Sequence, residues 1–187
     1  MRKTLYAILI AAAFAAPVAL TASAQSDNPM VGGAPMYRTK DIVDNAVNSA
    51  DHTTLVAAVK AAGLVDTLKG KGPFTVFAPT NAAFDKLPAG TVQTLLMPEN
   101  KGMLTKVLTY HVVAGKYDSK KLMQLIKKGH GQAMLKTVSG GTLTARMNGM
   151  NGISLTDEKG GTSNVTTADV YQSNGVIHVV DTVLMPR

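Results

Sequence analysis

The chain has 187 residues and no cysteine, with 19 Lys and Arg against 12 Asp and Glu and a formal net charge of +7. The lack of cysteine excludes a disulfide framework, a thiol nucleophile and a lipid-modified N-terminal cysteine. The positive charge favours anionic partners such as acidic polysaccharide or lipid headgroups, but it does not indicate a fold.

The first 24 residues have the three parts of a secretory signal peptide. MRK is positively charged, LYAILIAAAFAAPVAL is apolar, and residues 22–24 form a cleavage site of small residues. The apolar run contains Pro17 and is short for a membrane span. We therefore expect cleavage near Ala24 and export to the periplasm or the medium. A flexible leader over residues 25–35 would precede one domain over residues 36–186.

Apolar residues recur at helical spacing through the first half of the domain. The pattern predicts helices over residues 41–50, 52–62, 92–96 and 99–109, with one more turn over 64–68. Asp51 is placed to cap the second helix and Gly63 to end it. A later helix over residues 120–129 would take Ser119 as its N-cap.

The stretch GPFTVFAPTNAAFDKLP joins a strand directly to a helix. Residues 74–78 are predicted to form a buried strand that Pro79 ends, because proline cannot donate to a sheet ladder. Thr80 or Asn81 would cap the helix over residues 82–87.

The last third of the chain is rich in β-branched residues and turn signals. Five short segments, AMLKTV, TLTARM, GISLT, SNVTTADV and GVIHVVDTVL, are separated by glycine-containing turns. This composition predicts a sheet that the early strand must join. With helices first and strands later, the fold class is α+β.

Three of these stretches resemble the fasciclin domain. GPFTVFAPTNAAFDKLP is similar to its first signature, LTYHVVAG to its Tyr-His segment, and NGVIHVVDTVLMP to its second signature. The resemblance implies an α+β domain in which helices pack on a β-wedge, in secreted and surface proteins concerned with adhesion. A single domain behind a signal peptide is similar to the bacterial secreted members.

The resemblance also implies that the two signatures form adjacent central strands. Phe74 and Val76 would then be neighbours of Val176, His178 and Val180. On this interpretation the junction at Pro79 and Thr80 is architecture and not a reaction centre.

Two segments match adhesion motifs of the family. The Tyr-His segment consists of Tyr110, His111, Val112 and Val113, and the resemblance implies that it contacts a partner. The alternative is that the phenol and imidazole pack in the core with internal hydrogen bonds. Asp169 and Val170 match the acidic-aliphatic centre of a second adhesion motif, while their flanking residues depart from it.

The sequence predicts neither an enzyme nor a metal site. His178 and His52 lack a second ligand at metal-binding spacing, and Glu occurs only at positions 99 and 158. No nucleophile elbow or phosphate-binding loop is present. We therefore expect no catalytic residue, no metal and no cofactor.

A basic run accompanies the predicted helix over residues 120–129. Lys120, Lys121, Lys127 and Lys128 recur seven apart, nearly two helical turns, and share a broad face. That face is predicted to bind an anionic surface, the alternative being a solvated exterior with no partner.

These observations favour a secreted or periplasmic, non-enzymatic adhesion module. Its partner would be a cell-surface protein or an acidic polysaccharide, with no specific nucleic acid. The alternative is a carrier for an apolar ligand such as a carotenoid or a lipid, because some fasciclin proteins resemble carotenoid binders and 45% of the residues are hydrophobic.

Overall fold

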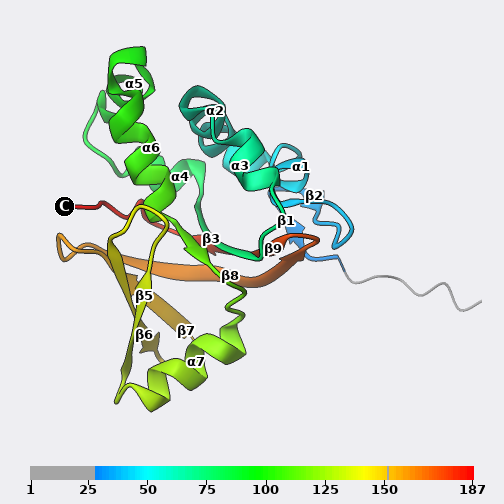
Figure 1. Ribbon diagram of the computed structural model, residues 1–187, viewed down its shortest axis with the longest axis vertical. Helices are drawn as coiled ribbons and strands as arrows, with labels where there is room; N and C mark the ends of the chain where they lie inside the picture. The colour runs from blue at the N-terminus through cyan, green and yellow to red at the C-terminus, as the bar shows by residue number, and fades with distance from the viewer. Residues whose placement is uncertain (1–27, 151) are drawn as a thin grey trace, which may run out of the picture.

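The computed structural model describes residues 28–150 and 152–187 (Figure 1). The predicted signal peptide and residues 25–27 lie outside the described residues. The helices among the described residues are α1 (Ile42–Ala46), α2 (Thr53–Ala62), α3 (Val65–Lys69), α4 (Asn81–Asp85), α5 (Thr91–Leu96), α6 (Lys101–Tyr110) and α7 (Ser119–Lys128), with single 3-10 turns at Ala50–His52 and Pro98–Asn100.

A seven-stranded sheet runs through the molecule in the order β4-β3-β9-β8-β7-β6-β5. Its strands are β3 (Phe74–Pro79), β4 (Val112–Ala114), β5 (Gln132–Lys136), β6 (Thr142–Asn148), β7 (Gly152–Thr156), β8 (Thr162–Gln172) and β9 (Gly175–Val180). Among the described strands of this sheet, only β3 and β9 pair in parallel. A single bridge between Val113 and Thr137 brings the two edges together, so the sheet is nearly a closed barrel. The α+β prediction is confirmed.

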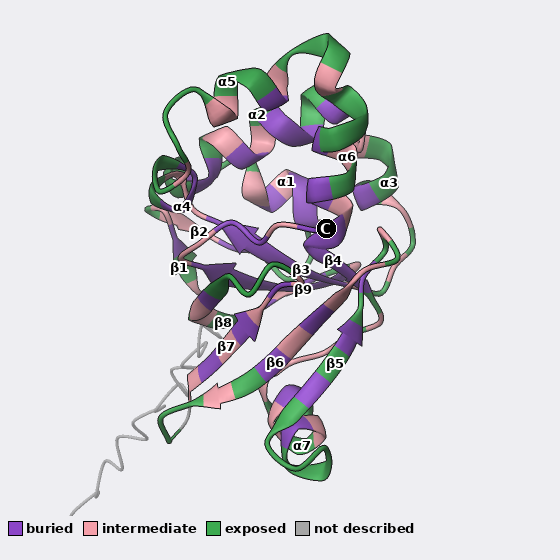
Figure 2. Cartoon of the chain, turned by 90° about the vertical axis from the view of Figure 1, so that its left-hand side faces the viewer, coloured by how far each residue is buried: buried purple, intermediate pink, exposed green. Residues whose placement is uncertain are grey.

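The sheet separates two hydrophobic cores. Helices α1 to α6 cover the outer face of β3 and β9 and form the larger core. The smaller core fills the inside of the curved sheet, where α7 packs on β5 and β6. Figure 2 shows buried residues where helices meet the sheet and exposed residues on the outer side of α7.

The predicted pairing of the two signature strands is confirmed, but its register is wrong by one residue. Val76 pairs with Ile177 and Phe77 with His178, whose rings stack at 5.6 Å. Val76 therefore faces the helices, whereas Val176, His178 and Val180 lie on the other face of the sheet. Both strands are buried on both faces, so alternation in their sequences does not distinguish one face from the other.

The strand-to-helix junction contains two caps. Thr80 Oγ1 accepts a hydrogen bond from Ala83 N at 3.2 Å and caps α4, as predicted. Asn81 instead caps α2, because its Oδ1 accepts from Thr54 N at 3.0 Å. The predicted cap of α2, Asp51, makes no such bond; it lies in the 3-10 turn before the helix. The junction thus joins β3 to two helices.

The packed part of the chain begins upstream of Met36. Residues 30–35, predicted to belong to a flexible and exposed leader, form the hairpin of β1 (Met30–Val31) and β2 (Ala34–Pro35). Val31 is buried in the larger core, and Met36 N donates to Pro29 O at 3.0 Å. The expectation of an exposed leader is therefore wrong for these residues, because one apolar side chain anchors the hairpin.

Candidate functional site

Tyr110 lies inside the smaller core with a fully buried side chain. Its Oη donates to the Thr142 carbonyl at 2.8 Å and accepts from Glu158 N at 3.1 Å. A Cβ on Gly141 would lie 2.7 Å from the ring, so the backbone there closes tightly over the phenol. Burial raises the pKa of the Tyr110 phenol to about 12. Tyr110 therefore holds the ends of β6 and β7 together from the last turn of α6.

His111 is 3% exposed, and both of its ring nitrogens are in hydrogen bonds. Nε2 lies 3.0 Å from Leu184 N, which can only donate, so Nε2 must be the unprotonated acceptor. Nδ1 then carries the proton and donates to Val107 O at 2.8 Å. Burial lowers the pKa of His111 to about 4. The imidazole is neutral and connects α6 to the C-terminal segment.

Val112 and Val113 complete the Tyr-His segment, and both are buried on β4. Val112 belongs to the larger core and Val113 to the smaller one. The structure thus brings all four residues of the segment together in the interior, the arrangement of the packing alternative. In this conformation the segment positions other elements and presents no side chain to a partner.

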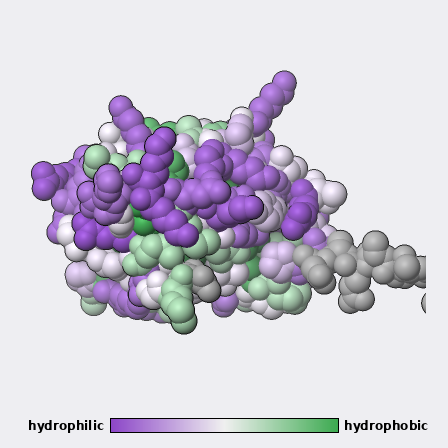
Figure 3. Space-filling view, turned by 90° about the horizontal axis from the view of Figure 1, so that it is seen from below, coloured by the Kyte–Doolittle hydropathy of each residue, from purple (hydrophilic) through white to green (hydrophobic). Residues whose placement is uncertain are grey.

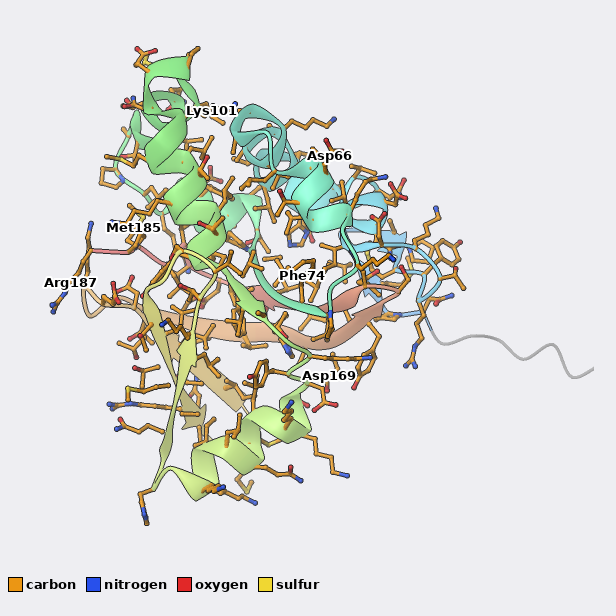
Figure 4. All side chains as sticks on the ribbon, in the orientation of Figure 1. Asp66, Phe74, Lys101, Asp169, Met185 and Arg187 are labelled. Atoms are coloured by element: carbon orange, nitrogen blue, oxygen red, sulfur yellow. The ribbon has the colours of Figure 1, made fainter. Side chains whose placement is uncertain are left out.

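Asp169 lies at an irregular part of β8, next to the start of α7 (Figure 4). It has a positive φ of 61°, uncommon for a residue with a side chain. Its carboxylate accepts from Ser119 N at 2.6 Å and from Ser119 Oγ. Val170 beside it is buried. In the second predicted motif, Asp169 therefore anchors the start of α7, and Val170 packs in the core.

The N-cap of α7 is Asp118 and not Ser119 as predicted. Asp118 Oδ1 accepts from Lys121 N at 2.8 Å. Ser119 is the first helical residue, and its N–H and hydroxyl donate to Asp169. Two carboxylates therefore lie at the positive end of the helix dipole, where negative charge is stabilised. The second carboxylate comes from a strand distant in the sequence, which explains why local sequence reasoning did not find it.

His178 supports the same region from beneath and is fully buried. Its Nε2 donates to Tyr117 O at 2.7 Å, and its Nδ1 accepts from Asp169 N at 3.4 Å. Burial lowers the pKa of His178. His178 thus connects β9 to the segment that precedes α7.

The lysines of the predicted basic face are exposed along α7. Leu122 and Ile126 are buried against the sheet, and Lys120, Lys121, Lys127 and Lys128 are exposed on the solvent side. The helix contains no acidic residue. Within the described ranges 28–150 and 152–187, the ion pairs involve other lysines, Lys69 and Lys86. Figure 3, seen from the α7 side, shows hydrophilic side chains over this region.

An apolar cavity of about 90 Å³ lies between α1, α2 and α3 and the sheet. Val56, Val59, Val76, His111 and Ile177 are among the residues that line it. Sequence reasoning singled out His111 for another role and missed the four apolar residues as a site, because apolar side chains that line a cavity have the same pattern as those that fill a core. Its size admits a short apolar group.

The described residues contain no cluster of three or more His, Asp or Glu side chains placed to hold a metal ion. No helix over residues 28–150 and 152–187 has the length and apolarity needed to cross a membrane.

Residues 50–186 match the Fasciclin domain family. Protein sll1483 of Synechocystis sp. is 46% identical over 146 residues, which cover 78% of this chain and 73% of that protein. Immunogenic protein MPB70 of Mycobacterium bovis is 37% identical, with 75% of this chain and 66% of that protein covered. Cell surface glycolipoprotein MPB83 of the same species is 34% identical, with 86% of this chain and 68% of that protein covered.

A solved structure has the same fold. It is the FAS1 domain pair from the insect cell adhesion molecule Fasciclin I, which matches with a TM-score of 0.69 at 21% identity. The match covers 78% of this chain and 51% of that one. The two signature strands pair at the centre of the sheet. With the family match over residues 50–186 and the 46% identity to a relative, this pairing shows that the chain belongs to the fasciclin domain family.

Proposed function

We propose that the protein is an exported, non-enzymatic adhesion module that binds acidic polysaccharide through the basic face of α7. The observation that carries the proposal is a helix with Lys120, Lys121, Lys127 and Lys128 exposed, no acidic residue and no described ion pair to these lysines. Unneutralised charge of one sign on one face attracts polyanions and speeds their association.

The geometry of α7 suits a linear polyanion. The pairs 120/121 and 127/128 are seven residues apart, about 10 Å along the helix axis. Lys127 and Lys128 lie in the last turn, where the helix dipole favours positive charge. The four lysines are exposed, so bound charges can pair with them without a deep pocket.

One observation supports adhesion over catalysis, and two support export over retention in the cell. The histidines His111 and His178 have both ring nitrogens in internal hydrogen bonds, which leaves neither available as a general base. A relative at 34% identity is named a cell-surface glycolipoprotein. The N-terminal signal pattern supports export of this chain as well.

Replacing Lys127 and Lys128 by glutamate is expected to weaken binding to polygalacturonate about tenfold or more at low salt, because two attractive charges become repulsive. Isothermal titration calorimetry measures the affinity, which should also fall steeply with added salt. The matched control is Lys60→Glu/Lys101→Glu, with the same charge change at exposed positions of α2 and α6; Lys101 lies at the opposite end of the molecule from α7 in Figure 4. Equal affinity of the two double variants would exclude the α7 face as the binding surface.

The cavity favours a second candidate function, a carrier for an apolar ligand. A cavity of about 90 Å³ is too small for a whole carotenoid, and it suits part of an acyl chain. The wild-type protein should then take up a fluorescent fatty acid, and Val56→Phe should reduce uptake by filling the cavity. Val47→Phe, at an exposed position outside the cavity lining, should bind as wild type. Absence of uptake by the wild-type protein would exclude the carrier.

A further inference from the structure

Tyrosine rings and cationic side chains gather on one surface beside the N-terminal end of α7. This tyrosine–cation surface consists of Tyr37, Tyr117, Tyr171, Arg38, Lys40, Lys116 and Lys121. It comes from three segments of the chain, before α1, before and within α7, and at the end of β8. The stretches MYRTK and GKYDSKK each contain both residue types, and the fold brings the two stretches together around Tyr171.

Backbone hydrogen bonds hold the three segments side by side. Ser173 N donates to Lys40 O at 2.9 Å, which places the segment before α1 along the end of β8. Tyr117 N donates to Thr75 Oγ1 at 2.9 Å, which fixes the segment before α7 on the sheet. The surface is therefore built on a rigid scaffold and continues directly into the basic face of α7.

Each ring of this surface has a cation over it. The Arg38 guanidinium carbon and Lys116 Nζ each lie 4.8 Å from the centre of the Tyr171 ring. Lys121 Nζ lies 4.4 Å from the Tyr117 ring, and Lys40 Nζ lies 5.1 Å from the Tyr37 ring. These contacts orient the cations without neutralising them, since a ring carries no net charge.

The carboxylates nearby are already engaged. Asp118 caps α7 and accepts from Tyr171 Oη at 3.4 Å, and Asp169 accepts from Ser119. Asp41 caps α1 and pairs with Lys69. None of the ion pairs over residues 28–150 and 152–187 includes Arg38, Lys116 or Lys121. Asp118 and Asp169 keep their charge beside Tyr171, but Arg38, Lys40, Lys116 and Lys121 outnumber them, so the surface is net positive.

We propose that the tyrosine–cation surface is a subsite for a uronic-acid residue, an inference that rests on the proposed function and extends it. The carboxylate of a uronic acid pairs with a guanidinium or ammonium group, and the apolar face of its sugar ring can pack on an exposed tyrosine ring such as Tyr37. The Tyr171 ring holds both the Arg38 guanidinium and the Lys116 ammonium, and either cation can pair with such a carboxylate. The lysines of α7 lie on a convex helix and not in a groove that would follow a phosphodiester backbone, which favours the sugar over nucleic acid.

The test separates the Tyr171 ring, which orients Arg38 and Lys116, from the net charge of the surface. Tyr171→Leu leaves the net charge unchanged and removes the ring, so we expect about fivefold weaker binding of polygalacturonate. Tyr171→Phe keeps the ring and should bind within about twofold of wild type. Dextran sulfate, a polyanion without carboxylates, should bind equally to all three proteins. Unchanged polygalacturonate affinity in Tyr171→Leu would overturn the proposal.

A second variant keeps the test decisive if Tyr171→Leu fails to fold, as a thermal melt would show. Arg38 is exposed, and Arg38→Gln should weaken polygalacturonate binding several-fold; unchanged affinity would overturn the proposal.

Tighter binding of the wild-type protein to oligo(dT) than to polygalacturonate would also overturn it, in favour of nucleic acid. Loss of binding only in Lys127→Glu/Lys128→Glu contradicts the subsite and leaves the proposed function standing. No wild-type binding to any polyanion contradicts both.

Discussion

Replacing Tyr110 by alanine is expected to lower the free energy of unfolding by about 4 kcal/mol. The side chain is fully buried in the smaller core, so its removal leaves a cavity and two unpaired backbone groups, Thr142 O and Glu158 N. Loss of the ring accounts for most of the effect. Chemical denaturation followed by circular dichroism measures the change.

Tyr110→Phe is the matched control, because it keeps the ring and removes only the hydroxyl. Its cost should be about 1–2 kcal/mol, the range for hydrogen-bonding groups left unpaired in a buried site. An exposed contact residue would behave differently, with both substitutions within about 0.5 kcal/mol of wild type. That outcome would contradict the interior position of the Tyr-His segment.

Acidification is expected to destabilise the fold through His111, by about 3 kcal/mol between pH 7 and pH 4. Burial lowers the pKa of His111 from its ordinary value of 6.5 to about 4 in the folded protein. Between these two pKa values, the unfolded chain binds a proton on His111 that the folded protein does not bind. The stabilising contribution is complete above pH 6.5 and decreases as the pH falls toward 4.

The slope of stability against pH measures this effect. Between pH 6 and pH 5, above the range in which most carboxylates titrate, His111 should contribute about 1.2 kcal/mol per pH unit. Burial lowers the pKa of His52 and His178 too, and both act in the same direction. His111→Gln, which does not titrate, should have a slope smaller by about this amount whatever its absolute stability. An unchanged slope would contradict the buried neutral imidazole.

The central architecture was predictable from the sequence because its determinants are local. The β-branched run after Gly72 and the second signature before Pro186 each indicate a strand, and the family resemblance implies that they pair. Thr80 is a good N-cap in the position where a helix must begin. Helix and strand order follow from periodicity, which is set by geometry over a few residues.

The remaining features depend on contacts between distant segments. The register of β3 against β9 is not encoded in alternation, because both faces are buried. Asp169 meets Ser119 only after the sheet has formed, and Asn81 caps a helix that precedes it by 27 residues. The exposure of the α7 lysines was predictable from one amphipathic helix. The tyrosine–cation surface was not, since it combines three segments.

Chemical-shift mapping tests most directly whether the partner contacts the surface of α7 and not the Tyr-His segment. Polygalacturonate titrated into ¹⁵N-labelled protein should shift the amide signals of residues 116–128, with weaker shifts at residues 37–40 and 171–173. The amides of residues 110–113 should stay unmoved. Shifts confined to residues 110–113 or to the cavity lining, with α7 unaffected, would contradict the proposed surface.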